Sequence, residues 1–313
     1  MNLVKSSAAL AVLTVFSSTA LANNEFYGKA NVTVQLSDEG DGSFTEVKSN
    51  ASRLGVNSHY EVNDDLKVIV KFEVQVDVDG EGDENISGRN QYVGLEGGFG
   101  KLVLGKNDTV TKQSQGKVDL FNDMEGDIKN IFQGENRLRD TVTYKTPKFG
   151  EFQLGLTYVT NGSANEDDEG VSAALFYGDN QLKKTDWFAS VAMDRDVKGY
   201  DVNRATVSTK LAGIVLGAMI QNQENLDSGE ELDGYFVSAK YTIENWDLKG
   251  QFQQGSYELE DTGVTTSDDA TGYTVGVDYK IAKNAKIMAF YTDYKFDDAT
   301  DRNYFGTGIE YKF

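Results

Sequence analysis

The chain has 313 residues, of which 50 are acidic and 30 are basic, and its formal charge of −20 at pH 7 argues against nucleic acid and other polyanionic partners. It has no cysteine and one histidine, which excludes disulfides and leaves little material for a zinc site or a catalytic triad. An aromatic content of 11% and long alternating runs argue against an acidic disordered chain.

The first element in the chain is predicted to be a secretory signal peptide over residues 1–22. Lys5 precedes an apolar run over residues 8–16, and the segment ends in the small-residue pattern Ala-Leu-Ala, which predicts cleavage before Asn23. Residues 23–313 then carry 29 basic and 50 acidic side chains, a formal charge of −21. An exported chain without cysteine must be stabilised by backbone pairing and packing.

Residues 66–79, LKVIVKFEVQVDVD, alternate between apolar and mostly polar side chains with a period of two. That period is typical of a strand with one apolar and one hydrated face. The run is longer than the about five or six residues usual in globular sheets, and it is long enough to cross a bilayer as a tilted strand. Proline occurs once, at Pro147, as expected of paired strands, because each proline removes a ladder hydrogen bond.

Two kinds of connection alternate between the apolar runs along the chain. Short turns are predicted at 62–65, 97–100, 146–150, 179–185, 212–213, 244–245 and 283–284. Longer and mostly acidic connections are predicted at 38–45, 80–87, 108–138, 161–169, 197–200, 222–231, 260–270 and 297–302. Seven short and eight long connections imply about sixteen antiparallel strands with both chain ends on the short-turn side.

This pattern predicts an all-β fold, a transmembrane antiparallel β-barrel over residues 23–313. Short turns at one rim, long loops at the other and an even number of strands are typical of outer-membrane barrels. The apolar side chains of residues 66–79 then point to lipid or to a neighbouring subunit, and the polar ones line a water-filled lumen. Residues 214–220 are apolar on both faces, which indicates a subunit contact, a bulge or an apolar patch in the lumen.

Several segments resemble the general trimeric porins of Gram-negative outer membranes, and the resemblance covers essentially all of residues 23–313. Its carriers are NEFYGKANVTVQ near the start, SRLGV at 52–56, GRNQYVGLEGGFGKLVLGKND at 88–108, RLRDTVTYKTPKFGEFQLGLTY at 137–158 and the terminal IEYKF. Their order, the 31-residue third loop over 108–138 and the terminal Phe313 carry the resemblance together.

The resemblance implies a homotrimer of sixteen-stranded barrels, each with a pore that is narrowed by the third loop folded into the lumen. In this family, arginines on the wall face carboxylates on that loop. The wall candidates here are Arg53, Arg89, Arg137 and Arg139, and the loop candidates are Asp119, Asp123 and Glu125. Glu125 is the foremost loop candidate, because NDMEGD replaces the family's Pro-Glu-Phe-Gly-Gly turn. The resemblance also implies that the outer-membrane assembly machinery reads the terminal Phe313.

The alternation of side chains tests the wall candidates one by one. Arg53 alternates with apolar neighbours, which places it in the lumen if they face outward. Arg137 and Arg139 share a parity with the threonines that follow them, which is again lumenal. Arg89 is ambiguous, because it shares a parity with Val93. Arginine suits such a wall because it stays charged when crowded, and opposed rows of charge orient polar solutes.

The expected function is therefore that of an outer-membrane porin, a channel for passive diffusion of ions and small hydrophilic solutes, with no catalysed reaction and no cofactor. The acidic charge predicts weak cation selectivity. The expected partners are outer-membrane lipid and lipopolysaccharide, with two further copies of the chain. An alternative is that exposed loops, such as 161–169 and 260–270, make the protein mainly an adhesin or phage receptor.

A barrel enzyme and a secreted soluble β-sandwich are also compatible with alternating strands. A barrel enzyme, such as a phospholipase or protease, would need a catalytic partner for His59, and a β-sandwich would bury the apolar parity within itself. The segment DVDGEGDENISG at 77–88 has the acids and the central glycine of a calcium loop. Gly88 stands where such a loop needs a bidentate glutamate, so no metal site is expected there.

Overall fold

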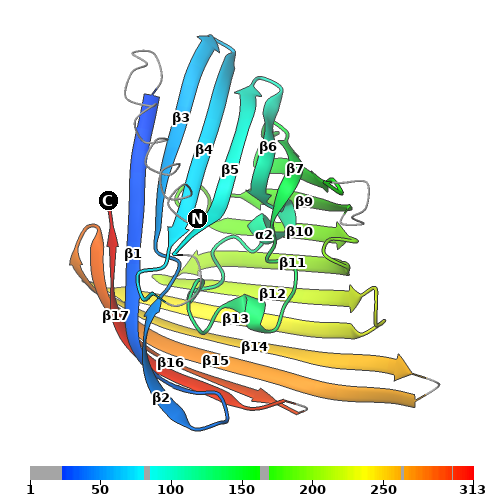
Figure 1. Ribbon diagram of the computed structural model, residues 1–313. Helices are drawn as coiled ribbons and strands as arrows, with labels where there is room; N and C mark the ends of the chain where they lie inside the picture. Colours follow the sequence, from blue (N-terminus) through cyan, green and yellow to red (C-terminus); the bar gives the residue numbers. More distant parts are fainter. Residues whose placement is uncertain (1–22, 81–84, 163–168, 262–263, 298) are drawn as a thin grey trace, which may run out of the picture.

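A computed structural model describes residues 23–80, 85–162, 169–261, 264–297 and 299–313, which form one closed antiparallel barrel (Figure 1). The strands of the first part are β1 (Asn23–Asp38), β2 (Ser43–Ser49), β3 (Arg53–Asn63), β4 (Leu66–Val76), β5 (Ile86–Gly97), β6 (Gly100–Asp108), β7 (Arg137–Lys145) and β8 (Phe152–Val159). Those of the second part are β9 (Gly170–Gly178), β10 (Trp187–Arg195), β11 (Tyr200–Leu211), β12 (Ile214–Asn225), β13 (Glu231–Ile243), β14 (Trp246–Asp261), β15 (Val264–Ala282), β16 (Ala285–Phe296) and β17 (Arg302–Lys312). The predicted signal segment, residues 1–22, lies outside the described residues.

The seventeen strand segments make sixteen strands of the barrel, because β2 and β3 are successive parts of the same strand beside β1. The first part of β1 pairs with β3, and its last part pairs with β2. Ala51, which has φ +49°, lies between the two segments. β1 also pairs with β17, which closes the sheet, so the barrel has no open edge to expose to lipid. The predicted barrel of about sixteen strands is confirmed.

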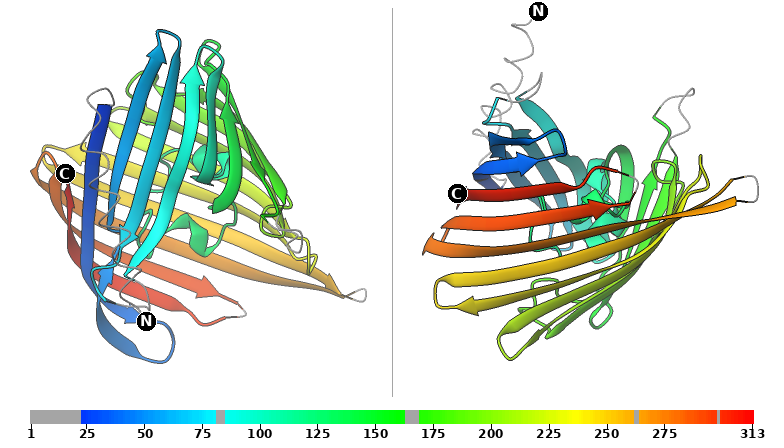
Figure 2. Two further views of the ribbon diagram at one scale, coloured as in Figure 1. Left: turned by 45° about the horizontal axis from the view of Figure 1, so that its top comes forward. Right: turned by 90° about the horizontal axis from the view of Figure 1, so that it is seen from below.

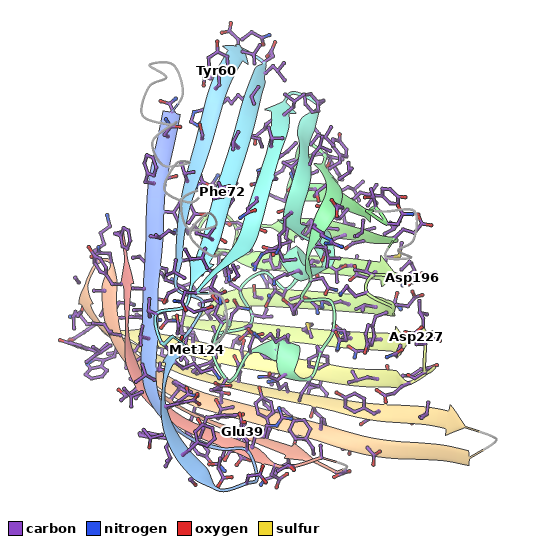
Figure 3. The ribbon with its side chains drawn as sticks, in the orientation of Figure 1. Glu39, Tyr60, Phe72, Met124, Asp196 and Asp227 are labelled. Atoms are coloured by element: carbon purple, nitrogen blue, oxygen red, sulfur yellow. The ribbon has the colours of Figure 1, made fainter. Side chains whose placement is uncertain are left out.

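Short turns and longer connections alternate around the two rims, as the sequence predicts. Glu39, Asp196 and Asp227 lie at the rim of the longer connections, whereas Tyr60 lies near the opposite rim (Figure 3). The long connection expected at 260–270 is instead mostly strand: β14 and β15 stay paired up to Asp261 and Val264, because threonine-rich sequence continues the ladder. Residues 163–168, in the other loop considered as a receptor, lie outside the described residues.

Apolar side chains cover the outer face of the barrel, and polar side chains line its inner face. Along β1, Val34 and Leu36 are each 50% exposed, whereas the alternating Thr33, Gln35 and Ser37 are buried on the inside. A soluble β-sheet protein instead buries its apolar side chains and exposes its polar ones. The polar parity of 66–79 therefore faces the lumen, as predicted.

The third loop, which we call L3 (residues 109–136), leaves β6, runs through the lumen and returns to β7 (Figures 1 and 2). It contains the short helix α2 (Val110–Ser114) and the 3₁₀ turn η1 (Ile128–Asn130). The side chain of Thr109 caps α2 by accepting a hydrogen bond from the Lys112 N–H. No helix among the described residues is long and apolar enough to cross a bilayer.

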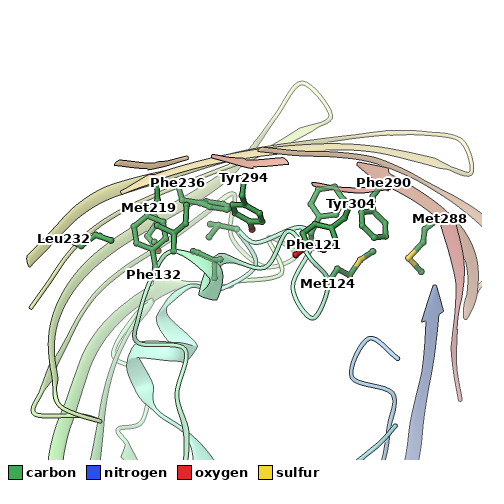
Figure 4. Packing of buried hydrophobic residues seen from close by; sticks show 14 residues of the cluster. Phe121, Met124, Phe132, Met219, Leu232, Phe236, Met288, Phe290, Tyr294 and Tyr304 are labelled. Carbon is green, nitrogen blue, oxygen red and sulfur yellow. The ribbon is translucent and has the colours of Figure 1, made fainter. Parts of the chain in front are cut away.

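Apolar side chains anchor L3 to the inner wall at two places. Val110 of α2 packs with Phe176 and Phe188 of β9 and β10. Further along, L3 residues pack against wall residues of β12 to β17 (Figure 4), and this cluster, which we call the L3 anchor, includes Val118, Phe121, Met124, Ile128, Ile131, Phe132, Met219, Leu232, Phe236, Met288, Phe290, Tyr294 and Tyr304. Met219 explains why residues 214–220 are apolar on both faces: the interpretation as an apolar patch in the lumen is confirmed. L3 therefore covers the wall from β8 to β17 and faces β1 to β7.

Candidate functional site

A carboxylate at the tip of L3 meets three cations of the barrel wall. Asp123 Oδ2 accepts a hydrogen bond from Lys29 Nζ at 2.9 Å and another from Arg53 Nη2 at 3.2 Å. Asp123 Oδ1 lies 4.0 Å from Arg89 Nη2. Burial alone would raise the pKa of Asp123, but the nearby positive charges, Lys29 foremost, outweigh it and lower the pKa to about 2. The ionised carboxylate thus connects L3 to β1, β3 and β5.

Glu125, two residues further along L3, makes a second connection to the wall. Its carboxylate forms an ion pair with Lys48 of β2 and accepts a hydrogen bond from Gln35 Nε2 at 3.0 Å. The sequence favoured Glu125 as the main partner of the wall arginines. In the structure Asp123 contacts Arg53 and Arg89, and Glu125 contacts a lysine and a glutamine instead.

Arg89 reaches the lumen through a β-bulge in β5. Arg89 and Asn90 together lie opposite Glu73 of β4. Because the extra residue shifts the alternation, Arg89 faces inward although it shares a parity with Val93, which is 50% exposed on the outer face. Arg89 Nε donates a hydrogen bond to Glu73 Oε1 at 2.9 Å, so the guanidinium is held in place on the wall.

A second bulge, in β7, separates Arg137 from Arg139. Arg139 and Asp140 together lie opposite Lys106 of β6, and Asp140 has φ +57°. Arg137 lies before the bulge, and its Nε is 2.9 Å from Asp108 Oδ1. The Arg139 side chain is 70% exposed and lies 3.4 Å from the Asp140 carboxylate. The structure therefore brings Arg137 to the site but does not bring Arg139 there, because the bulge breaks the alternation on which that expectation depended.

Asp119 shapes L3 itself and does not face the wall arginines. It is 8% exposed, and its two carboxylate oxygens accept hydrogen bonds from the N–H groups of Phe121 at 2.9 Å and Ile128 at 3.0 Å. Burial, reinforced by the neighbouring charge of Asp127, raises the pKa of Asp119 to about 8. The expectation that Asp119 lies opposite the arginines is not met, because its oxygens are used inside the loop.

Two cavities lie beside the tip of L3 and share part of their lining. The outer cavity, of about 520 Å³, extends to Lys48 and Ala51 on the side of the longer connections. The inner cavity, of about 560 Å³, extends to Lys148 and Lys184 in the short turns at the other rim. The residues that line both cavities are Arg89, Lys112, Asn122 and Arg137. The shared lining therefore comes from L3 on one side and from β5 and β7 on the other.

Several charged residues of the site were not among the sequence candidates. The alternation along β1 predicts that the Lys29 side chain points into the lumen, but it does not predict which residue Lys29 contacts. Arg204 of β11 is buried and lies 2.6 Å from Glu135 at the end of L3. No motif singles out Lys29, Lys48 or Arg204, because the path of L3 decides which lumenal side chains it contacts.

Phe313 lies at the seam where β1 and β17 close the barrel. Its N–H donates a hydrogen bond to the Gly28 carbonyl at 3.1 Å, and its own carbonyl accepts one from the Gly28 N–H at 2.8 Å. Its ring lies over Gly28, where a Cβ would collide with it, and lies 5.7 Å from the Tyr311 ring between centroids. These contacts make Phe313 a residue of the seam, and its recognition during assembly stays a prediction.

The described part of the chain brings no set of metal ligands together. Within those residues no three His, Cys, Asp or Glu side chains approach one another as metal ligands do. His59 Nε2 lies 3.0 Å from Asn23 Nδ2 in a hydrogen bond near the short-turn rim. Residues 81–84 of the calcium-like segment lie outside the described residues.

A closed barrel with an apolar exterior, a polar lumen and an inward-folded loop held by ion pairs is the architecture of an outer-membrane β-barrel. A sequence model of the family described as Gram-negative porin matches residues 9–299. The chain belongs to this family, and it is a protein of the outer membrane. The resemblance found in the sequence motifs is confirmed.

Known relatives and solved structures agree with this assignment. The chain is 26% identical over 181 residues to the major outer membrane protein P.IB of Neisseria sicca, covering 54% of this chain and 50% of that protein. The chain thus spans about half the length of the curated relatives it matches. Its fold is similar to the trimer form of OmpT, an outer membrane protein of Vibrio cholerae (TM-score 0.72, 19% identity, 94% of this chain and 100% of that one). It is also similar to an anion-selective porin from Comamonas acidovorans (TM-score 0.73, 17% identity, 93% and 100%).

Proposed function

We propose that the protein forms a water-filled channel for passive diffusion of ions and small hydrophilic solutes across the outer membrane. The observation that carries this proposal is the lining that the two cavities share between L3 and the wall. Most of the side chains that line the two cavities are charged or polar, although Phe176, Phe188 and Met124 are among them. Such a lining suits hydrated solutes, because an apolar solute would have to displace oriented water.

We propose that the constriction of the channel lies at the tip of L3. Asp123 and Glu125 supply negative charge on the loop, and the wall opposite supplies Arg53, Arg89 and Arg137. Opposed charges across a narrow passage have a lower effective dielectric between them than in bulk water, so they orient water and dipolar solutes. Arg139 and Asp119 have no part in this constriction.

The assembly of the channel is also a proposal. The apolar outer face suits lipid and a neighbouring subunit, and the solved trimer form of OmpT supports a homotrimer. Export through a signal over residues 1–22, recognition of Phe313 by the assembly machinery and contact with lipopolysaccharide stay predictions. We also infer that the protein catalyses no reaction and holds no cofactor, which is consistent with membership of a channel family.

Liposome swelling tests the proposed function. Purified protein is reconstituted into liposomes, which are then diluted into isotonic sugars of increasing size. We expect swelling rates that fall with solute size and do not saturate with concentration, as in diffusion without a binding step. Absence of swelling in every sugar, compared with protein-free liposomes, would contradict the proposal. The weak cation selectivity predicted from net charge is measured separately, by the zero-current potential in a KCl gradient.

A further inference from the structure

The inner cavity has a charge opposite in sign to that of the chain. Nine cationic and three acidic side chains line it, although the whole sequence has a formal charge of −20. Its lysines are Lys71, Lys112, Lys117, Lys145, Lys148 and Lys184, and its arginines are Arg53, Arg89 and Arg137. We call this space the inner vestibule. The outer cavity differs: five cations and four acids line it. The excess of positive charge therefore belongs to the inner vestibule and not to the lumen in general.

The three acids of the inner vestibule already have partners. Glu73 pairs with Arg89, and Asp108 pairs with Arg137, each at 2.9 Å. Asp179 accepts hydrogen bonds from backbone N–H groups of its own turn. Glu73 and Asp108 also lie 3.8 Å from Lys71 Nζ and Lys112 Nζ, so these carboxylates balance at most two of the six lysines.

Four lysines of the inner vestibule have no carboxylate within ion-pair distance among the described residues: Lys117, Lys145, Lys148 and Lys184. Lys145 Nζ lies 4.6 Å from the centre of the Phe176 ring, and Lys148 Nζ donates to the Gly178 carbonyl at 3.2 Å. Burial, with the positive charge of Arg53 second, lowers the pKa of Lys117. Positive charge is thus concentrated in the inner vestibule, and the described residues supply these four lysines with no carboxylate at ion-pair distance.

These four lysines come from L3, from β7 and from two turns, with Lys148 in the turn between β7 and β8. Lys117 belongs to L3, Lys145 ends β7, and Lys184 lies in the turn between β9 and β10. A volume of about 560 Å³ is within the range of about 300–1,000 Å³ usual for small-molecule pockets. Gln113 and Asn122 add amide donors to the lining. Donors on several sides of one enclosed space can contact two or more anionic groups of the same molecule, which a single surface lysine cannot do.

We propose that the inner vestibule is a binding site for small solutes that carry two or more carboxylate or phosphate groups. Such a solute replaces the missing counter-charge at several lysines at once, whereas a monovalent anion reaches one or two of them. The proposal rests on the proposed function, because the solute reaches the vestibule through the channel. Binding in the inner vestibule adds a binding step to a diffusion path that otherwise has no binding step.

The test uses inorganic tripolyphosphate as the probe and current block as the readout. The intact protein is reconstituted in planar bilayers, and the current of each variant is normalised to its own value in KCl alone. The vestibule variant carries Lys117→Gln, Lys145→Gln and Lys184→Gln. The matched control carries Lys210→Gln, Lys240→Gln and Lys283→Gln, which remove the same charge outside the vestibule lining. Heat-modifiable gel migration verifies that each barrel is folded.

We expect tripolyphosphate to block the unmodified channel and acetate at an equal concentration of negative charge to leave it open. The half-blocking concentration should rise at least tenfold in the vestibule variant and less than twofold in the control. No block of the unmodified channel, or an equal shift in both variants, would overturn the proposal. Calorimetric titration of the detergent-solubilised full chain with tripolyphosphate gives a readout independent of conduction. Saturable binding that weakens only in the vestibule variant supports the binding site even if the protein conducts no current. Absence of binding contradicts the binding site even if the channel conducts.

Discussion

Lys29 and Asp123 are 94 residues apart in the sequence, yet Lys29 Nζ donates a hydrogen bond to Asp123 Oδ2 at 2.9 Å. Lys29 pairs with Lys312 in the ladder that closes the barrel, and Asp123 lies at the tip of L3. The contact therefore joins the closing seam to the loop in the lumen. Because the opposite side of L3 is packed into the L3 anchor, the loop is held from both sides of the barrel.

Removal of the charge at position 123 should change ion selectivity. Asp123→Asn leaves Lys29, Arg53 and Arg89 without their shared counter-ion, so the constriction becomes more positive. We expect the chloride-to-potassium permeability ratio to rise at least twofold, measured by the zero-current potential in a KCl gradient. Asp140→Asn, whose carboxylate lies beside the exposed Arg139, is the control and should leave the ratio unchanged. Equal effects of the two variants would contradict the assignment of Asp123 to the constriction.

Acid should release the tip of L3 only at low pH. The pKa of Asp123 is lowered to about 2, from about 3.9 for a free aspartate, so its contribution to holding L3 is present above about pH 4 and is lost as the pH falls through 2. We expect the noise of the open-channel current to stay constant from pH 8 to pH 4 and to rise below pH 3. Asp123→Asn should be noisy at every pH. A transition of the unmodified channel centred between pH 4 and pH 6 would show that another group controls the loop.

Truncation in the L3 anchor should loosen the loop and leave the barrel folded. Phe132 is 1% exposed and packs in the cluster between L3 and the wall. Phe132→Ala creates a cavity there, and such truncations cost about 3–5 kcal/mol. We expect faster amide hydrogen exchange across residues 118–132 and unchanged exchange in β1 and β17. Phe26→Ala on the outer face, where Phe26 is 54% exposed, is the control and should leave exchange in L3 unchanged.

A charge on the outer face should lower the stability of the barrel more than a charge in the lumen. Val93 is 50% exposed near the middle of β5 and lies on the outer face of the barrel. Val93→Arg should cost about 2–4 kcal/mol, as expected for arginine near the bilayer midplane. Tyr92→Arg places the same residue one position away, in the lumen, and should cost less. Urea-induced unfolding in lipid vesicles measures the loss of stability in each variant. An equal loss in the two variants, or a larger loss for Tyr92→Arg, would contradict the outward direction of the apolar side chains.

Alternation with a period of two was enough to predict the barrel, its number of strands and the direction of most side chains. It fails at the bulges in β5 and β7, where one extra residue reverses the parity. Arg89 was therefore ambiguous in the sequence and is lumenal in the structure, while Arg139 was predicted to be lumenal and lies apart from the site. A bulge depends on the pairing of two strands, so the sequence of one strand does not reveal it.

The contacts of L3 were harder to predict than the strands. The sequence favoured Glu125 among the acids of the loop, but Asp123 contacts the wall arginines, Glu125 reaches a lysine, and Asp119 accepts hydrogen bonds within L3. The difference comes from the fold of the loop around its apolar residues. The net charge of the chain was a poor guide to the inner vestibule for a related reason, since most acids lie elsewhere in the molecule.

A single cysteine shows whether the conducting route passes between L3 and the wall of β5 and β7. The chain has no cysteine of its own, and Asn122 lines both cavities. Single-channel current of Asn122→Cys is recorded before and after addition of a bulky thiol reagent, with Val93→Cys on the outer face as the control. We expect modification at position 122 to lower the conductance by at least half and the control to keep its full current. A modified Asn122→Cys channel with undiminished conductance would contradict this route.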